Sequence, residues 1–317
     1  MSVVETAKIG LPDVVSLSYL SGAVLGVAAN SNFQTGYDSF KLKRINTVCL
    51  LVSDDGATEG YGTYDWDTLA AQHLTHIKWG WSTIGKSERN GYLGFDGTKT
   101  ELKAKILVLN SGYVSLTGQE VKRVNAQGDL VFMKPWALAC IVAGMQNGSE
   151  IGEPPTYKYI NASGVQQDSS WDPKLDYGEL IDAGLTFVEP VDSGGFRIVV
   201  GNTTYGKDAN FVWNRIGVVE AGGYVSYDLR TVMEAKFTGN KAATGAATAI
   251  LNFVKARMTD YLNDDIIVAD DNAPLGYKNL SVVIDGNTAI INVTIFPVQG
   301  VDFILNTIYL ESAVQTA

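Results

Sequence analysis

The hydrophobic positions in the first part of the chain alternate between short apolar runs and amphipathic stretches. Residues 46–52 form a continuous apolar and β-branched run, which predicts a buried strand of an α/β sheet. Apolar positions recur every three to four residues over the segment 65–81, which predicts a helix that Asp65 or Asp67 caps. The apolar run over residues 103–109 (KAKILVL) predicts a second strand.

Proline and glycine delimit the next elements. An apolar segment rich in small residues follows Pro135, and Gly144 and Gly148 surround its end, which predicts a helix over 136–145. A short helix begins at Leu180 and is ended by Gly184. The remaining expected segments are a strand over 130–133, a loop over 147–176, and strands over 185–190 and 194–200.

The pattern changes near residue 195. A long helical region over 210–237 precedes Gly239, and an amphipathic helix over 246–262 follows. The turn sequence 285–287 (Asp-Gly-Asn) predicts a hairpin. The strands expected here cover 266–269, 280–284, 289–296 and 301–310. We therefore predict a mixed α/β domain over residues 1–195 and a smaller α+β domain over 196–317.

Composition and charge narrow the classes of function. The chain has 317 residues, a net charge of −10 and only 18% charged residues. A net negative charge argues against DNA or RNA as a main partner, because phosphate binding needs a basic face. A surface short of charge is often covered by partners. No signal peptide is expected, and the apolar stretch over 136–145 is too short to span a bilayer, so we expect no membrane insertion.

One segment matches a phosphate-binding motif. Residues 80–87 (GWSTIGKS) fit the P-loop pattern G-x-x-x-x-G-K-[ST], in which Lys86 and Ser87 would contact phosphate and magnesium. That loop needs a strand before it and a helix after it. A helical segment precedes Gly80, and Gly91 and Gly94 disfavour a helix after Ser87. A nucleotide-binding α/β protein therefore stays an alternative, although the elements expected around the motif differ from those that a P-loop needs.

The other candidate sites are weaker still. His73 and His76 stand three apart on the predicted helix, but no further ligand follows in a known zinc pattern. Cys49 and Cys140 are far apart in the sequence and form no CxxC pair, so a disulfide scaffold or cysteine zinc site is excluded and two buried free thiols are expected. No Ser-His-Asp signature is present. We expect no enzyme activity, no cofactor and no metal.

The order of segments resembles the tail sheath proteins of contractile-tailed bacteriophages and related injection machines. Single motifs are short, but their order and spacing extend over nearly the whole chain. The segments that carry the resemblance are Leu20-Ser21-Gly22, residues 45–51, SERNGYLG (87–94), Pro135 with residues 137–145, IGEPPTYK (151–158), Asp182-Ala183-Gly184 with 185–190, RIVVGNTTY (197–205), Asn214-Arg215-Ile216, residues 227–240, and FILNTIYLE (303–311).

The resemblance implies a structural subunit that polymerises around a tail tube and contracts to drive the tube through the host envelope. It implies a middle α/β domain similar to subtilisin without its catalytic residues, and a C-terminal domain that links subunits by strand exchange. The implied partners are copies of the chain itself, the tail tube protein, and baseplate and tail terminator proteins, in a virion assembled in the host cytoplasm. Family members usually carry further N-terminal material, so we expect either a trimmed fragment, the C-terminal two-thirds of a sheath subunit, or a short member.

Two features suggest where subunits meet. Residues 301–310 read as a strand with residues 301, 303, 305, 307 and 309 on one face, and such a terminal strand is able to pair with a neighbour's sheet edge, although an ordinary closing strand fits equally well. Basic residues gather early and acidic residues late, which suits head-to-tail contact, although chance clustering and a monomeric α/β binding domain stay open. The contact candidates are Val301, Phe303, Leu305, Tyr309, Asp264, Asp265, Asp270, Asp271, Lys41, Lys43 and Arg44.

Overall fold

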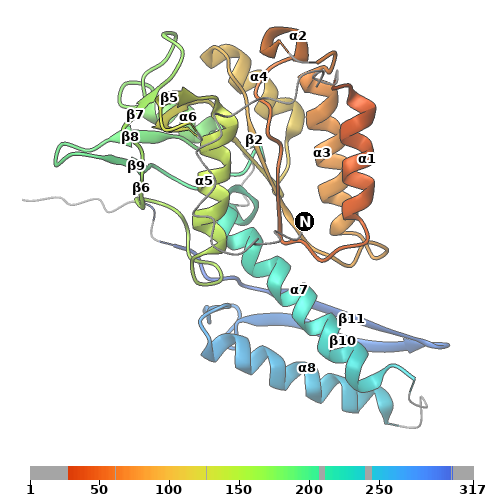
Figure 1. Ribbon diagram of the computed structural model, residues 1–317. Coiled ribbons are helices and arrows are strands. Elements are labelled where there is room, and N and C mark those ends of the chain that lie inside the picture. The colour runs from red at the N-terminus through yellow and green to blue at the C-terminus, as the bar shows by residue number, and fades with distance from the viewer. Residues whose placement is uncertain are drawn as a thin grey trace, which may run out of the picture.

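The computed structural model describes residues 28–60, 62–125, 127–206, 211–239, 245–300 and 302. Figure 1 shows two portions joined by the long helix α7 (Ile216–Phe237). We call the portion formed by residues 28–206 the body. The C-terminal unit consists of α8 (Ala246–Asn263) and the hairpin of β10 (Tyr277–Asp285) and β11 (Thr288–Ile295), which pack against the far part of α7.

The centre of the body is a small parallel sheet. Its strands are β1 (Thr47–Cys49), β2 (Asn90–Gly94) and β3 (Val114–Thr117), in that order. The chain passes from β1 to β2 through α3 (Trp66–Gly80) and from β2 to β3 through α4 (Lys99–Leu109). Parallel strands need such helical crossovers. The mixed α/β character that the sequence predicts is confirmed.

The helix α3 begins directly after its capping residue, Asp65. Asp65 Oδ2 accepts a hydrogen bond from the Thr68 N–H at 2.8 Å, so Asp65 rather than Asp67 is the N-cap. The apolar face of α3 is buried against the sheet and includes Leu69 and Ile77, both without exposed surface. Regular spacing and a strong cap made this helix predictable.

Residues 103–109 are the end of α4, and the predicted strand is wrong. Thr98 and Glu101 form a capping box, in which the Glu101 carboxylate accepts from the Thr98 N–H at 2.8 Å. Leu107 and Val108 are 74% and 82% exposed. The prediction of a buried strand is wrong because it takes these two exposed apolar residues to be buried. The buried face has helical spacing and consists of Leu102, Ile106 and Leu109.

The helix α5 (Pro135–Asn147) covers the other face of the sheet and packs against all three strands. Pro135 stands at its start, as the sequence predicts, because the first helical position needs no N–H donor. Gly94 allows the close packing, since a Cβ there would lie 2.2 Å from the Trp136 nitrogen. The sheet is therefore buried on both faces.

Short elements complete the body. Two antiparallel sheets, in the orders β5-β4-β7 and β6-β9-β8, lie beside α5. Gly184 ends the predicted short helix with φ +95°. The remaining elements are α1 (Asn30–Phe40), α2 (Gly56–Glu59), β4 (Glu120–Val124), β5 (Leu130–Met133), β6 (Tyr159–Ile160), β7 (Gly164–Gln166), α6 (Tyr177–Ala183), β8 (Val188–Pro190) and β9 (Phe196–Ile198).

The C-terminal elements follow the sequence pattern with two corrections. The long helix does not begin at residue 210, because a 3-10 turn (Phe211–Asn214) and the extended Arg215 precede α7. Residues 266–269 do not form the predicted strand, and only one isolated bridge joins Ile267 to Pro297. The hairpin forms as predicted, with Gly286 at φ +58° in its two-residue loop. Residues 303–310 lie outside the described residues.

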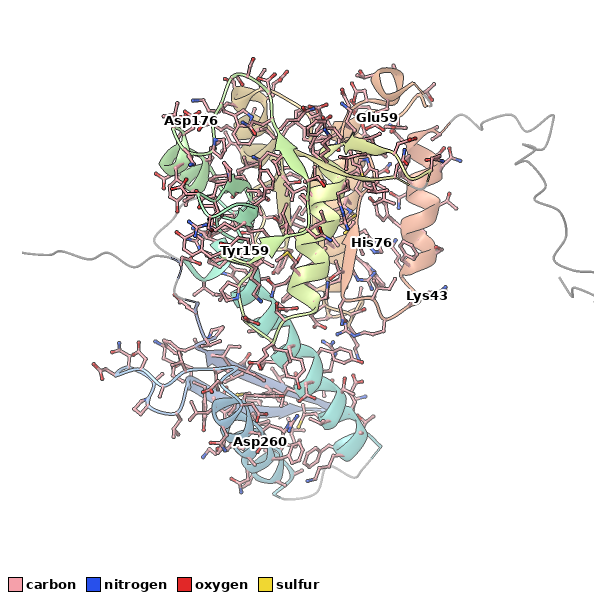
Figure 2. The ribbon with its side chains drawn as sticks, turned by 60° about the vertical axis from the view of Figure 1, so that its left-hand side comes forward. Lys43, Glu59, His76, Tyr159, Asp176 and Asp260 are labelled. Carbon is pink, nitrogen blue, oxygen red and sulfur yellow. The ribbon has the colours of Figure 1, made fainter. Side chains whose placement is uncertain are left out.

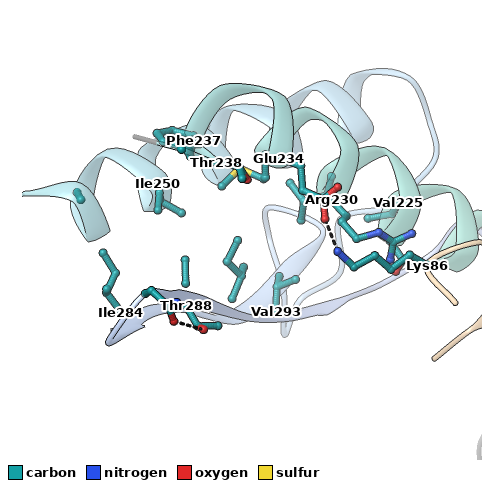
Figure 3. Close-up of a pocket in the computed structure, with 18 of the residues that line it drawn as sticks. Lys86, Val225, Arg230, Glu234, Phe237, Thr238, Ile250, Ile284, Thr288 and Val293 are labelled. Atoms are coloured by element: carbon teal, nitrogen blue, oxygen red, sulfur yellow. Dashed lines mark hydrogen bonds and ion pairs between the residues drawn. The ribbon is translucent and has the colours of Figure 1, made fainter. Parts of the chain in front are cut away.

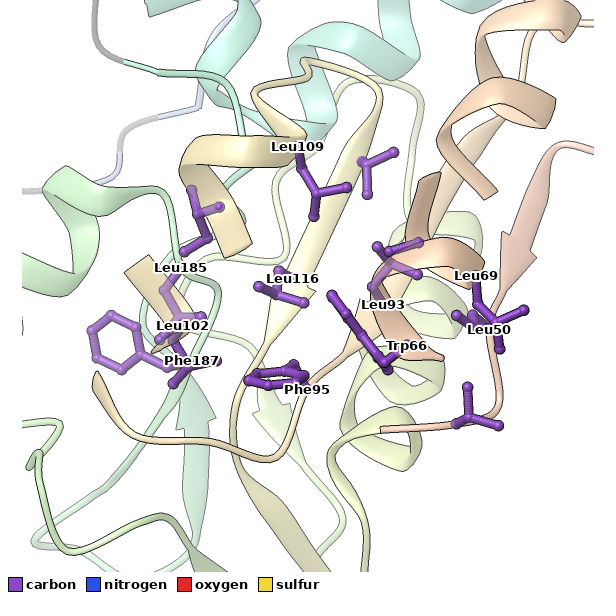
Figure 4. Close-up of a cluster of buried hydrophobic side chains, with 14 of the residues drawn as sticks. Leu50, Trp66, Leu69, Leu93, Phe95, Leu102, Leu109, Leu116, Leu185 and Phe187 are labelled. Carbon is purple, nitrogen blue, oxygen red and sulfur yellow. The ribbon is translucent and has the colours of Figure 1, made fainter. Parts of the chain in front are cut away.

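Buried apolar side chains form three clusters. The first fills the space between the sheet, α3 and α4 in the body and includes Trp66, Leu93 and Leu116 (Figure 4). The second lies under α5 and extends to Ile216. The third begins at Ala221 and joins α7, α8 and the hairpin. A division of the chain into two domains near residue 195 stays a prediction. Among the helices of the described part, none is long and apolar enough to cross a membrane.

Candidate assembly interface

A buried ion pair attaches α7 to the body. The Glu88 carboxylate accepts two hydrogen bonds from the Arg230 guanidinium, at 2.7 and 2.6 Å, and one from Ser226 Oγ at 3.0 Å. Burial raises the pKa of Glu88, but these hydrogen bonds outweigh burial, so its pKa lies below the ordinary value. Glu88 therefore stays charged at neutral pH, and a bidentate pair of this kind fixes both distance and orientation.

Two further basic residues strengthen this attachment. Arg44 donates to the Glu88 carbonyl at 2.8 Å, and its guanidinium lies 3.7 Å from the centre of the Tyr227 ring. Lys86 forms an ion pair of 2.6 Å with Glu234. The C-terminal unit is thus held to the body by contacts along α7.

A groove runs between α7 and the hairpin. Figure 3 shows apolar side chains pointing into it from both sides, with Lys86, Arg230 and Glu234 near one end. Its volume is about 960 Å³. The apolar lining residues are Val225, Leu229, Met233, Phe237, Ile250, Ile284, Ala289, Ile291, Val293 and Ile295. A groove of this composition suits an apolar occupant.

The hairpin next to the groove has unpaired edges. Within the described residues, β10 and β11 pair only with each other as a named sheet. Unpaired N–H and C=O groups on such an edge are able to hydrogen-bond an added strand. Val283 and Ile290 are cross-strand partners and are 54% and 42% exposed. The hairpin therefore offers backbone bonding at its edges and apolar surface beside them.

The predicted acidic candidates are exposed on the C-terminal unit. Asp264 and Asp265 directly follow α8, and Asp270 and Asp271 lie in the loop before β10. Asp270 accepts a hydrogen bond from the Asn272 N–H at 2.6 Å. The structure brings these four residues to one unit, and their role in contact between copies stays a prediction.

The predicted basic candidates lie on the body, at the end of α1. Lys41 forms an ion pair of 2.7 Å with Asp38, and Lys43 is exposed. Arg44 makes the contacts with Glu88 and Tyr227 described above. Figure 2 shows Lys43 on the body and Asp260 on the C-terminal unit. The basic and acidic candidates therefore belong to different portions of the molecule.

The four apolar candidates near the C-terminus, Val301, Phe303, Leu305 and Tyr309, lie outside the described residues. The described residue between the first two, Asp302, contacts the start of α7. Its carboxylate accepts from Arg215 and, at 2.8 Å, from Thr156 Oγ1. The chain is thus fastened to the junction of body and α7 at this point.

The phosphate-binding motif does not have the structure of a P-loop. α3 precedes residues 80–87, and the strand β2 follows them, whereas a P-loop lies between a strand and a helix. Lys86 is paired with Glu234, and Ser87 Oγ accepts from Arg89 at 2.9 Å. Both motif side chains are therefore used inside the chain.

The two histidines are part of the core. His73 is fully buried, and its Nδ1 hydrogen-bonds the Tyr37 hydroxyl at 3.1 Å. His76 Nε2 lies 2.7 Å from Arg89 Nη1. Burial lowers the pKa of His76 to about 4, and the Arg89 charge adds to this, so His76 is a neutral acceptor. Among the described residues, no group of three or more metal-ligating side chains is found.

No protein-family model matches the chain. Over 225 residues, or 70% of the chain, it is 27% identical to the tail sheath protein of Staphylococcus phage Twort. Over 279 residues, or 86% of the chain, it is 24% identical to the tail sheath protein of Bacillus phage SP01. The predicted resemblance to tail sheath proteins is confirmed. The chain spans 37% and 46% of the lengths of these relatives.

Solved structures share the fold of the chain. A sheath tail protein from Listeria innocua matches 86% of the chain, and 57% of that protein, with a TM-score of 0.65 and 13% identity. The contracted helical sheath of the anti-feeding prophage matches 89% of the chain, and 75% of that protein, with a TM-score of 0.61 and 15% identity. At these identities the similarity is one of fold.

The junction of the portions also contains a carboxyl group with a shifted pKa. Glu220 on α7 accepts hydrogen bonds from Gln146 Nε2 and from the Gly152 N–H. Burial raises the pKa of Glu220 to about 7, and these bonds and Lys158 offset only part of the effect. The folded protein therefore binds this proton more tightly than the unfolded chain, and the stabilisation present below the ordinary pKa is lost as pH rises to about 7.

We expect Glu220→Gln to remove this dependence on pH. The variant should match the wild type near pH 4.5 and exceed its free energy of unfolding at pH 8 by about 1–3 kcal/mol. Urea unfolding at the two pH values measures the difference. An equal difference between the proteins at both pH values would contradict a raised pKa at this position.

Proposed function

We propose that the chain is a structural subunit of a contractile tail sheath, which polymerises around a tail tube and contracts to drive the tube through the host envelope. Two kinds of observation support this. The relatives from phages are tail sheath proteins, and the structural neighbours include the sheath of an injection system in the contracted state. The groove and the unpaired hairpin edges supply a place where copies could join.

The groove beside the hairpin carries the proposal. In the described structure its apolar walls come from α7, α8 and both strands of the hairpin, which pair only with each other as a named sheet. In an extended chain, the sequence 301–310 would place Val301, Phe303, Leu305 and Tyr309 on one face, as suits a strand that packs one face on apolar walls. We infer that the corresponding segment of a neighbouring copy adds to the hairpin and covers the groove. Backbone hydrogen bonds would then give affinity, and the apolar walls would set the register.

The charge distribution suggests the direction of assembly. The acidic residues after α8 and the basic residues after α1 lie on different portions of one subunit. In a head-to-tail contact, the acidic residues of one copy are therefore able to face the basic residues of the next. Such a contact repeats without closing on itself and builds a helix or a stack of rings. We infer that Asp264, Asp265, Asp270 and Asp271 of one copy face Lys41 and Lys43 of the next.

Contraction needs two packings of one rigid subunit rather than a chemical step. The Glu88–Arg230 pair and the Arg44–Tyr227 contact keep body and C-terminal unit together during such a change. We therefore propose no enzymatic activity and no cofactor. The proposed partners besides other copies are the tail tube, baseplate and terminator proteins, in a virion assembled in the host cytoplasm.

Sedimentation velocity at increasing protein concentration tests the proposal. A sheath subunit should give species far larger than a monomer, in amounts that grow with concentration. Ionic strength should weaken these species, because the proposed contact pairs exposed charges that salt screens. A single monomeric species at every concentration would argue for a monomeric domain instead.

A further inference from the structure

The two cysteines are neighbours in space. Cys49 ends β1, and Cys140 lies in the middle of α5. Their thiols are near enough to shift each other's pKa, upward for Cys49 and downward for Cys140, and both are half-buried and free. The expectation of two free thiols is confirmed, although both are half-buried rather than fully buried. Their distance in the sequence does not measure the distance between a strand and a helix packed on it.

Hydrogen bonds on both sides hold this strand and helix in register. At one end, the Trp136 N–H donates to Ser53 Oγ at 2.8 Å. At the other end, Asn147 Nδ2 donates to Thr47 Oγ1 at 2.6 Å, and Thr47 Oγ1 donates to Asn147 Oδ1 at 3.0 Å. The cysteines lie between these two contacts on both segments. These two contacts therefore bracket the cysteines and keep the two segments beside each other.

The backbones also approach closely here. The buried side of α5 carries the small residues Ala139 and Ala143. On β2, the backbone at Gly94 lies so close to Trp136 that a Cβ would not fit between them. A disulfide requires Cα atoms within about 7 Å and Cβ atoms that face each other. Close packing of small residues brings a helix and a strand toward that range.

One of the thiols is open to reagents. Cys140 lines a groove of about 490 Å³ on the outer side of α5, together with Trp136, Ile141 and Met145 from the helix and Tyr159 from β6. Figure 2 shows Tyr159 beside this helix. The hydrogen bond from Cys49 lowers the pKa of the Cys140 thiol, and the same bond raises the pKa of Cys49. Cys140 therefore borders a groove that a small reagent can enter, and it is the more acidic of the two half-buried thiols.

We propose that Cys49 and Cys140 close to a reversible intramolecular disulfide on reaction with a low-molecular-weight disulfide such as oxidised glutathione. The Cys140 thiolate attacks one sulfur of the reagent, whose S–S bond breaks and releases one glutathione thiolate, which takes up a proton. Cys49 loses its proton and attacks the Cys140 sulfur of the mixed disulfide, which releases the second glutathione. Two protein thiols are oxidised, and one reagent disulfide is reduced to two thiols.

The product would join β1 covalently to α5. A reducing cytosol keeps such a pair open, whereas oxidising surroundings close it. A closed pair would make the body more resistant to unfolding, because the crosslink restricts the unfolded chain. The body of the subunit would thus become stiffer in oxidising than in reducing surroundings.

Intact mass measurement tests the proposal. The reduced protein is incubated in its folded state with oxidised glutathione, quenched with acid and measured without reductant. We expect a mass lower by two hydrogen atoms, loss of both titratable thiols in denaturant, and full recovery with dithiothreitol. Peptide mapping should show residues 49 and 140 in one crosslinked pair within a single chain.

Single-cysteine variants separate this result from nonspecific oxidation. Cys49→Ser should stop at one stable glutathione adduct on Cys140, and Cys140→Ser should react at least about tenfold more slowly, because Cys140 lines the groove and Cys49 is not among its lining residues. Circular dichroism verifies that both variants are folded. Two glutathione adducts on the wild type, crosslinks only between chains, or two unreacted thiols would each overturn the proposal.

Discussion

Ala289→Arg should abolish the assembly of this protein and leave its fold intact. Ala289 is exposed on β11 and lines the groove that we assign to a neighbour's strand. An arginine there would fill the groove and place a charge where an apolar strand must be buried without a partner. The exposed position costs the isolated subunit little. Sedimentation velocity should show monomer only, with an unchanged thermal unfolding midpoint.

Ile290→Arg is the matched control. Ile290 is the next residue of the same strand, is 42% exposed and does not line the groove, because successive side chains point to opposite faces. A labelled peptide of residues 301–310 should bind the wild type and Ile290→Arg with similar affinity, and Ala289→Arg at least about tenfold more weakly, which is about 1.4 kcal/mol. Equal binding to all three proteins would contradict the groove as the binding site.

Gly94→Val should cost the body most of its stability. A Cβ at this position would lie 2.2 Å from the Trp136 nitrogen and 2.3 Å from the Pro135 carbonyl carbon, which are backbone atoms of α5. The helix would have to move away from the sheet and lose its packing on all three strands. We expect a loss of more than about 3 kcal/mol in the free energy of unfolding, measured by urea denaturation.

Gly144→Ala provides the control for this substitution. Gly144 lies inside α5, and a Cβ there would meet no atom within 4 Å. Alanine should stabilise the helix by about 0.5–1 kcal/mol. Comparing Gly94→Val with Gly144→Ala shows whether the loss of stability comes from the close packing at Gly94 or from replacing any glycine. A Gly94→Val protein as stable as the wild type would contradict the observed packing of α5.

Elements with strong local signals could be predicted from the sequence. Asp65, one of the two predicted capping residues, precedes α3, Pro135 marks the start of α5, and the Asp-Gly-Asn turn indicates the hairpin. These signals act within a few residues. The strand β2 shows the limit, because Gly91 and Gly94 counted only against a helix, whereas the structure needs glycine there for the close approach of His73 and of α5.

The residues of the candidate interface could be found only in part. The strands over 280–284 and 289–296 were predicted, but the groove requires α7 to lie beside β11, which no local pattern encodes. The contacts of Glu88 with Arg230 and of Cys49 with Cys140 join residues far apart in the sequence. The predicted strand over 103–109 failed for the opposite reason, because Leu107 and Val108 are apolar but exposed.

Negative-stain electron microscopy of the concentrated protein, beside Ala289→Arg, tests the central claim most directly. We expect hollow tubes or stacked rings with regular striations for the wild type, and dispersed single particles for the variant. Dispersed particles of identical size for both proteins would contradict the assignment of the chain as a self-assembling sheath subunit.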